Sequence, residues 1–142
     1  MGRNIHILRD EAELASTAAR RVIELAEQAV AERGSFHLAL AGGSTPRGLY
    51  HALARPEFQG KVPWERVRIY FGDERCVPPD HAESNYGMAR AALLERVPVP
   101  AAQVFRMQGE DPPQEAAAAY AKVLNRELPR DAEGWPRFDL VL

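Results

Sequence analysis

The sequence predicts an α/β fold in which a doubly wound, mostly parallel sheet carries helices on both faces, as a single domain over residues 1–142. Two observations lead to this prediction. Short apolar runs alternate along the chain with segments that repeat apolar residues at helical spacing. The run at residues 36–41 is apolar at almost every position, which is typical of a strand buried inside a parallel sheet. A composition of 46% hydrophobic and 27% charged residues is that of a globular protein.

The first third of the chain predicts two strands around one long helix. Residues 5–8 form a short apolar run and are expected to be a strand. Apolar residues recur near helical spacing over residues 11–32, and we expect Asp10 to cap this helix and Gly34 to end it. The run at residues 36–41 then supplies the second strand.

The middle of the chain predicts a turn, a helix and a further strand. After a turn over residues 42–45, we expect Pro46 to open a short helix that ends near residue 54, because its missing N–H costs nothing in the first turn. Residues 55–64 contain two prolines and a glycine and are expected to form a loop. A third strand is predicted over residues 67–71.

The last part of the chain continues the alternation of strands and helices. Two adjacent prolines lie inside an expected loop, and a serine and an asparagine that can cap a helix follow it. We expect this loop over residues 73–83, a helix capped by Ser84 or Asn85 and ending near residue 96, a strand over 104–107, an alanine-rich helix over 112–128 and a final strand over 138–142.

The final strand bears on domain organisation. A buried parallel strand should lead into a turn and a covering helix, and neither follows residues 138–142 in this sequence. The pattern favours an incomplete domain, the N-terminal portion of a larger one, over a small sheet that closes with its last strand. Such a chain would expose apolar surface and an unpaired strand edge. A complementary C-terminal fragment or self-association would cover that edge.

Charge, cysteine and histidine content exclude several classes of function. A formal net charge of −2 gives no electrostatic reason to expect a nucleic-acid partner. Cys76 is the only cysteine, so we expect neither an intrachain disulfide nor a cysteine-based zinc site. The four histidines form no pair at metal-ligand spacing, and no metal is expected. No apolar run approaches the roughly 20 residues of a membrane span, and the first residues lack the apolar core of a secretion signal. The expectation is a cytoplasmic protein without a membrane partner.

The turn over residues 42–45 has the chemistry of a phosphate site. Ligands of open α/β sheets bind beyond the carboxyl ends of the strands. Gly42 and Gly43 let the backbone turn tightly and approach a ligand, and Ser44 and Thr45 offer hydroxyls and backbone N–H groups at a helix N-terminus. The same residues also fit a capped helix after a tight turn, since they match neither a Walker loop nor a dinucleotide fingerprint.

The turn after the strand at residues 67–71 places charged groups at the same edge of the sheet. Asp73 and Glu74 bring two carboxylates, and Arg75 brings a guanidinium. An arginine there can hold a phosphate or a carboxylate through paired hydrogen bonds. Asp73 can move protons or orient a hydroxyl. A surface cluster of ion pairs is the competing interpretation.

Together the two loops resemble the 6-phosphogluconolactonases of the glucosamine-6-phosphate isomerase/6-phosphogluconolactonase superfamily. The sequence Leu-Ala-Leu-Ala-Gly-Gly-Ser-Thr-Pro at residues 38–46 is similar to the phosphate loop of that family. The sequence Tyr-Phe-Gly-Asp-Glu-Arg-Cys-Val-Pro-Pro-Asp-His at residues 70–81, with Glu-Ser-Asn-Tyr at 83–86, is similar to its second signature. Residues 138–142 look like the strand before its third signature. The resemblance covers essentially the whole chain, as the N-terminal part of a longer family member.

The resemblance implies a cytoplasmic hydrolase that converts 6-phospho-D-glucono-1,5-lactone to 6-phosphogluconate in the pentose phosphate pathway, without a metal or organic cofactor. It implies supporting catalytic roles for Asp73 and Arg75. The residues that it implies for the sugar phosphate are Gly42, Gly43, Ser44, Thr45, Arg75 and Asn85.

One feature implied by the resemblance lies outside this sequence. The third signature of the family, a Gly-rich turn with Asp-Gly-His, would follow Leu142, and its histidine is the expected general base. His81 is a poor replacement for it. We therefore expect the 142 residues by themselves to have little or no lactonase activity.

Two other functions compete with the lactonase. An amino-sugar-phosphate deaminase or isomerase of the same superfamily would share the phosphate loop and Asp73, although the strings Asp-Glu-Arg-Cys-Val-Pro and Ser-Asn-Tyr favour the lactonase. A non-catalytic sugar-phosphate-binding module, such as the effector domain of a repressor, usually follows a helix-turn-helix. The strand expected at residues 5–8 leaves no room for one.

Overall fold

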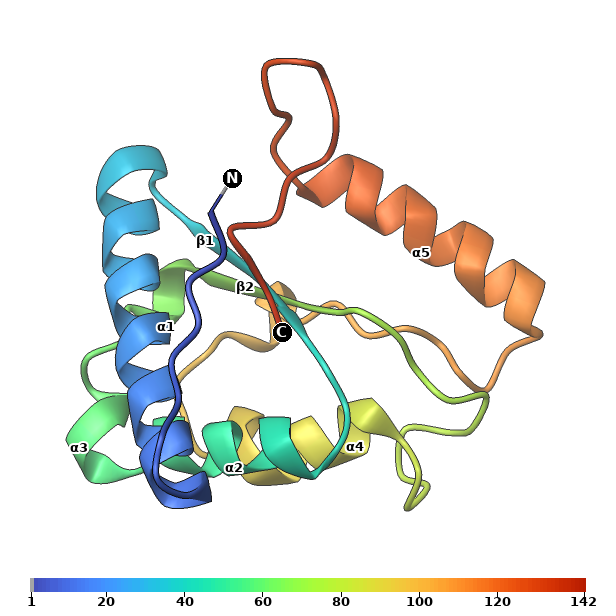
Figure 1. Ribbon diagram of the computed structural model, residues 1–142. Helices are drawn as coiled ribbons and strands as arrows, with labels where there is room; N and C mark the ends of the chain where they lie inside the picture. Colours follow the sequence, from blue (N-terminus) through green and yellow to red (C-terminus); the bar gives the residue numbers. More distant parts are fainter. Residues whose placement is uncertain (1) are drawn as a thin grey trace.

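A three-stranded parallel sheet organises the chain in the computed structural model, which describes residues 2–142 (Figure 1). The strand order is β2–β1–β3, with β1 at Phe36–Leu40, β2 at Val67–Phe71 and β3 at Leu140–Val141. The central strand β1 pairs in parallel with both neighbours. The predicted α/β class with a parallel sheet is confirmed.

Helices cover both faces of this sheet, as predicted. Helices α1 (Glu11–Arg33), α2 (Ser44–Leu53) and α4 (Asn85–Ala89) pack on one face, and the C-terminal half of α5 (Pro113–Glu127) packs on the other (Figure 1). None of the helices formed by residues 2–142 combines the length and the apolar content that crossing a bilayer requires. The helices are α1 Glu11–Arg33, α2 Ser44–Leu53, α3 Pro56–Gln59, α4 Asn85–Ala89 and α5 Pro113–Glu127, with 3-10 turns at Trp64–Arg66 and Ala101–Gln103 and a π-helical turn at Arg90–Leu94 that continues α4.

Helix α1 has the caps that its sequence predicts. The Asp10 carboxylate accepts a hydrogen bond from the N–H of Glu13 at 2.8 Å and so satisfies a donor of the first turn. Gly34 ends the helix with a φ of 82°, a left-handed conformation that favours glycine. The predicted loop over residues 55–64 is partly wrong, because Pro56 opens the four-residue helix α3 there.

The main core lies between the sheet and the face that carries α1, α2 and α4. Phe36, Leu38 and Leu40 alternate along β1 toward this face. Ala19 and Ala26 of α1 are fully buried, and their small side chains let the helix approach closely. The opposite face is thinner and contains the buried residues Ala39, Tyr70 and Leu128, with Phe105, Leu124 and Phe138 partly buried against them.

The strand predicted at residues 5–8 is wrong. This segment has no regular structure, and the side chains of Ile5 and Ile7 are 81% and 92% exposed. The segment runs alongside α1 (Figure 1), and no strand of the sheet pairs with it, although β3 has an open edge. An apolar run raises the propensity of a segment to form a strand, but the strand also needs a neighbouring strand with which to pair.

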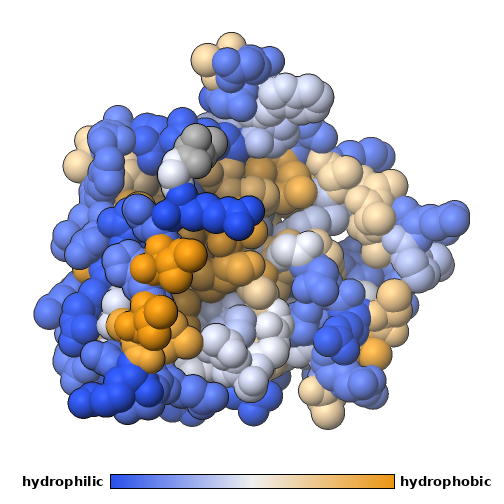
Figure 2. Space-filling view, viewed as in Figure 1, coloured by the Kyte–Doolittle hydropathy of each residue, from blue (hydrophilic) through white to orange (hydrophobic). Residues whose placement is uncertain are grey.

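Apolar surface gathers where the two ends of the chain lie, in the middle of the face seen in Figure 2. Besides Ile5 and Ile7, the side chains of Val141 and Leu142 are 58% and 36% exposed. Strand β3 pairs with β1 on one side only within residues 2–142.

The strand predicted at residues 104–107 shrinks to one bridge between Val104 and Ile69. The N–H of Phe105 donates to the carbonyl of Ile69 at 2.8 Å, as in a parallel ladder. The next ladder bond would join the N–H of Phe71 to the carbonyl of Phe105. Instead the hydroxyl of Tyr120 lies between these two groups, 2.8 Å from each. A side chain from α5 therefore replaces the backbone pairing.

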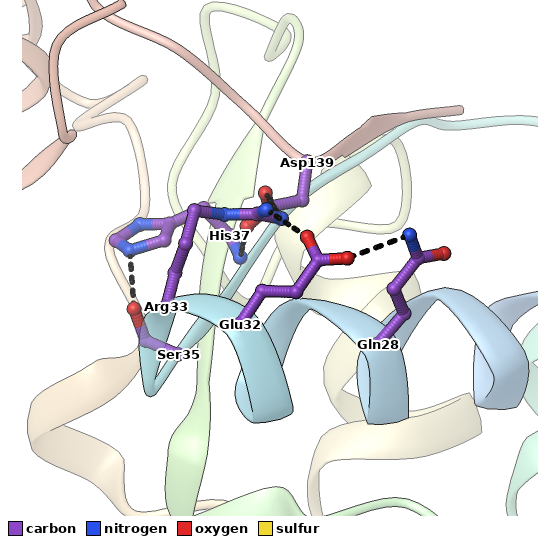
Figure 3. Close-up of polar contacts among 6 residues, drawn as sticks. All are labelled: Gln28, Glu32, Arg33, Ser35, His37 and Asp139. Atoms are coloured by element: carbon purple, nitrogen blue, oxygen red, sulfur yellow. Dashed lines mark hydrogen bonds and ion pairs between the residues drawn. The ribbon is translucent and has the colours of Figure 1, made fainter.

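The strand predicted at residues 138–142 is shortened for a similar reason. The N–H of His37 in β1 donates to a side-chain oxygen of Asp139 at 2.8 Å, while the backbone N–H of Asp139 donates to the carbonyl of His37 at 2.9 Å. The side chain of Asp139 thus takes one bond of the ladder, and the paired register starts at Leu38 and Leu140. The other oxygen of Asp139 accepts from Arg33 at 2.7 Å, and Figure 3 shows this carboxylate between β1 and the end of α1. Asp139 thus fixes β3 to both elements.

His37 is buried and belongs to the same group of polar contacts as Arg33 and Asp139 (Figure 3). Its ring nitrogens are each 3.0 Å from a hydroxyl, of Ser35 on one side and of Tyr70 on the other. Burial lowers the pKa of His37 below its ordinary value of 6.5, against an opposing effect of the Asp139 carboxylate. Arg68 and Arg33 lower it further, and Glu127 raises it.

We expect the stability of the protein to fall as the pH drops below 6.5, with part of this loss due to His37. The unfolded chain binds a proton on this histidine at a higher pH than the folded chain, so acid favours unfolding. His37→Gln should make the dependence of the urea midpoint on pH shallower below pH 6.5. His51→Gln, at an exposed position of α2, is the control. Equal slopes in the wild type and His37→Gln would contradict the prediction.

Candidate active site

The carboxyl ends of β1 and β2 lie side by side at one edge of the sheet. Leu40 is in register with Phe71, and the N–H of Gly72 donates to the carbonyl of Leu40 at 2.9 Å. The two signature loops therefore begin next to each other, as the sequence predicts. Each loop then leads toward a helix that packs on the main-core face, β1 to α2 and β2 to α4 (Figure 1).

The first loop turns directly into α2. Gly43 has a φ of 99° and occupies the N-cap position, a backbone conformation that other residues rarely adopt. The helix begins at Ser44, so Pro46 is its third residue, and the prediction that Pro46 opens the helix is wrong by two positions. Ser44 and Thr45 are exposed, and their N–H groups belong to the first turn, where no partner exists inside the helix. This end of α2 can accept a phosphate.

The second loop contains two carboxylates with different roles. Glu74 has a structural role. Its carboxylate accepts hydrogen bonds from the N–H groups of Asn85 and Tyr86 and from the hydroxyl of Ser84, at 2.7–3.0 Å. Glu74 thus holds the start of α4, which Ser84 caps. Asp73 is exposed and accepts one side-chain hydrogen bond, from Asn85 at 3.0 Å.

Asn85 brings the two loops together. Its buried side chain donates to the carboxylate and to the carbonyl of Asp73, at 3.0 and 3.3 Å. It also lies so close to Gly42 that a Cβ at residue 42 would be 2.6 Å from its Cγ atom. Glycine is required at residue 42 for this close approach. The structure thus assembles Gly42, Asp73 and Asn85 into one contact.

Arg75 lies on another side of the same loop. Together with Asp73 it lines a cavity of about 420 Å³ between the end of β2 and α5. Met107, Ala116 and Tyr120 form part of the opposite wall. Gly42–Thr45 and Asn85 do not line this cavity. Asp73 does line it and is hydrogen-bonded to Asn85, which lies against Gly42. Asp73 therefore connects the cavity to the first loop.

The wall formed by α5 is a part of the site that sequence reasoning missed. Its alanines carry no functional group, so no motif marks them. One signal was present in Gly109, where a Cβ would collide with the carbonyls of Arg75 and Val77. Glycine at residue 109 permits this contact, and the contact holds the loop against the segment that leads to α5.

His81 and Cys76 are two further titratable side chains of the second loop. His81 is exposed, and its Nδ1 atom accepts a hydrogen bond from the N–H of Glu83 at 3.1 Å within its own turn. Cys76 is an exposed free thiol on the rim of the cavity. Among residues 2–142 no group of three or more histidine, cysteine or acidic side chains is arranged to hold a metal ion.

Comparison with known proteins gives one family. Residues 9–142 match the model of the family described as glucosamine-6-phosphate isomerases/6-phosphogluconolactonase. A 6-phosphogluconolactonase of Treponema pallidum (strain Nichols) is 47% identical over 105 residues, which are 74% of this chain and 43% of the relative. A 6-phosphogluconolactonase of Nostoc sp. is 35% identical over 143 residues, which are 100% of this chain and 58% of the relative.

A solved structure agrees with these relatives. The 6-phosphogluconolactonase from Trypanosoma brucei superimposes with a TM-score of 0.81 at 31% identity, over 96% of this chain and 57% of that one. The chain spans about half the length of the curated relatives that it matches. With a match over residues 9–142 and the same fold, this chain belongs to the glucosamine-6-phosphate isomerase/6-phosphogluconolactonase family.

Proposed function

We propose that the protein containing this chain hydrolyses 6-phospho-D-glucono-1,5-lactone to 6-phospho-D-gluconate, in the oxidative pentose phosphate pathway and in the cytoplasm. The observation that carries the proposal is the contact of Gly42, Asp73 and Asn85, which joins a phosphate-accepting helix end to a carboxylate. The 35–47% identity to curated 6-phosphogluconolactonases supports it.

In the proposed reaction, the first loop and the charged side chains of the second loop have different roles. Water loses a proton as it adds to the C1 carbonyl carbon, and a tetrahedral oxyanion forms. The bond between C1 and the ring oxygen then breaks, and the ring oxygen takes up a proton to become the C5 hydroxyl. The N–H groups at Ser44 and Thr45 hold the phosphate and fix the distance of C1 from it. Arg75 stabilises the developing oxyanion. Asp73 orients a sugar hydroxyl or handles a proton, and its exposure leaves it accessible to substrate.

The family resemblance assigns the activation of water to a histidine in a turn that follows a strand in the position of β3. Strand β3 runs parallel to β1, so its carboxyl end lies at the same edge of the sheet as Gly42. In this proposal the chain supplies the phosphate-binding and charge-stabilising side of the site. The complementary C-terminal fragment or self-association expected from the sequence stays a prediction.

The test is hydrolysis of freshly prepared lactone by the protein that contains these residues, followed as 6-phosphogluconate appears. We expect a rate well above spontaneous hydrolysis. Release of ammonia from glucosamine 6-phosphate without lactone hydrolysis would instead identify the amino-sugar-phosphate deaminase. Binding of 6-phosphogluconate without turnover of either compound would identify the sugar-phosphate-binding module. Either result would overturn the proposal.

A further inference from the structure

Two buried tyrosine hydroxyls hold the strand ends from which the signature loops begin. At the end of β1, the hydroxyl of Tyr50 donates to the carbonyl of Ala41 at 2.6 Å and accepts from the N–H of the same residue at 2.9 Å. Ala41 directly precedes Gly42. A side chain of α2 therefore satisfies both backbone groups of the last residue before the phosphate loop.

The second hydroxyl does the same for β2. Tyr120 of α5 accepts from the N–H of Phe71 and donates to the carbonyl of Phe105, at 2.8 Å in both cases. Phe71 is the last residue of β2 and is followed by Gly72 and Asp73. The hydroxyl thus stands in the ladder where a neighbouring strand would pair, at the residue from which the charged loop begins.

Both hydroxyls use one donor and one acceptor, which is the capacity of a phenol. Tyr50 is 0% exposed and Tyr120 is 6% exposed, so water does not replace either hydroxyl when it is removed. Burial raises the pKa of each to about 12, so each keeps its proton near neutral pH. Removing either hydroxyl takes this partner from two backbone groups that are buried or partly buried, and it loosens the strand end.

We propose that Tyr50 and Tyr120 are positioning residues of the active site, Tyr50 for the phosphate loop at Gly42–Thr45 and Tyr120 for Asp73 and Arg75. This inference rests on the proposed lactonase function. It predicts different kinetic effects, because the first loop binds the phosphate throughout the reaction, whereas the second stabilises charge that develops in the transition state.

The chain contains a matched control. Tyr70 is also fully buried, and its hydroxyl lies 3.0 Å from the Nδ1 atom of His37. It lies within β2 and contacts neither signature loop through its hydroxyl. Tyr70→Phe therefore removes a buried hydroxyl and its hydrogen bond without releasing a strand end.

The experiment compares Tyr50→Phe, Tyr120→Phe and Tyr70→Phe in the complete protein. We expect all three to lower the urea midpoint. Tyr50→Phe should raise KM for the lactone about tenfold with kcat within about twofold, and Tyr120→Phe should lower kcat about tenfold with KM within about twofold. Tyr70→Phe should leave both constants unchanged. Equal kinetic effects of all three variants, or none from any, would overturn the positioning roles.

Amide hydrogen exchange separates this inference from the proposed function. Exchange should quicken at residues 41–45 in Tyr50→Phe, at residues 71–75 in Tyr120→Phe, and at neither in Tyr70→Phe. If the wild type does not hydrolyse the lactone, the proposed function fails, and this exchange pattern still decides whether the hydroxyls hold the loops. Unchanged exchange would overturn the inference. The two hydroxyls are tested by separate variants. If one variant does not fold, the kinetics and the hydrogen exchange of the other still test the inference.

Discussion

Arg75→Ala is expected to lower kcat/KM for 6-phospho-D-glucono-1,5-lactone by about 100-fold while the protein stays folded. The side chain of Arg75 is exposed on the rim of the cavity beside β2, so its loss removes no core packing. The backbone of the loop stays in place, because the N–H of Arg75 donates to Glu74 and its carbonyl packs against Gly109. In the proposed mechanism, the variant loses the positive charge that stabilises the developing oxyanion.

Two companion variants sharpen this test. Arg75→Lys keeps the charge but loses the planar fork of the guanidinium, and we expect an intermediate loss of activity. Arg21→Ala removes an exposed arginine of α1 that pairs with Glu24 at 3.0 Å, and should leave the kinetics unchanged. Thermal unfolding of all three variants checks the fold. Wild-type kinetics in Arg75→Ala would remove this residue from the site.

Gly42→Ala is expected to destabilise the protein by about 1–3 kcal/mol and to raise KM for the lactone. The backbone at residue 42 has no positive φ, so the effect is steric. The new methyl group would meet the Cγ atom of Asn85 at 2.6 Å and the Nδ2 atom at 3.0 Å. Asn85 cannot move aside cheaply, because two hydrogen bonds to Asp73 hold its buried side chain. Urea unfolding and steady-state kinetics measure the two effects.

A control and a rescue complete this prediction. Gly60→Ala introduces the same methyl group at a position with open space around it and a φ of −77°, so we expect little change in stability. The double variant Gly42→Ala with Asn85→Ala removes the collision, and its two effects on stability should be less than additive. Full additivity would show that the loops do not meet through Asn85.

The sequence was sufficient where a structure depends on neighbours along the chain. Helix α1 begins after Asp10 and ends at Gly34, because capping needs only residues within a turn of the helix end. The strands at Phe36–Leu40 and Val67–Phe71 follow from their apolar runs. That both loops lie at one edge of the sheet follows from the same alternation, since parallel strands end together.

Tertiary structure decided how the shorter predicted strands pair and which of the two adjacent carboxylates has a structural role. Residues 5–8 lack a partner, Tyr120 takes the place of a ladder bond beside Val104, and the side chain of Asp139 takes another at the start of β3. Adjacent Asp73 and Glu74 look alike in sequence, yet only Asp73 is left for a ligand. The reason is that hydrogen bonds of strands and loops join residues far apart in the chain, so their partners exist only once the helices have packed.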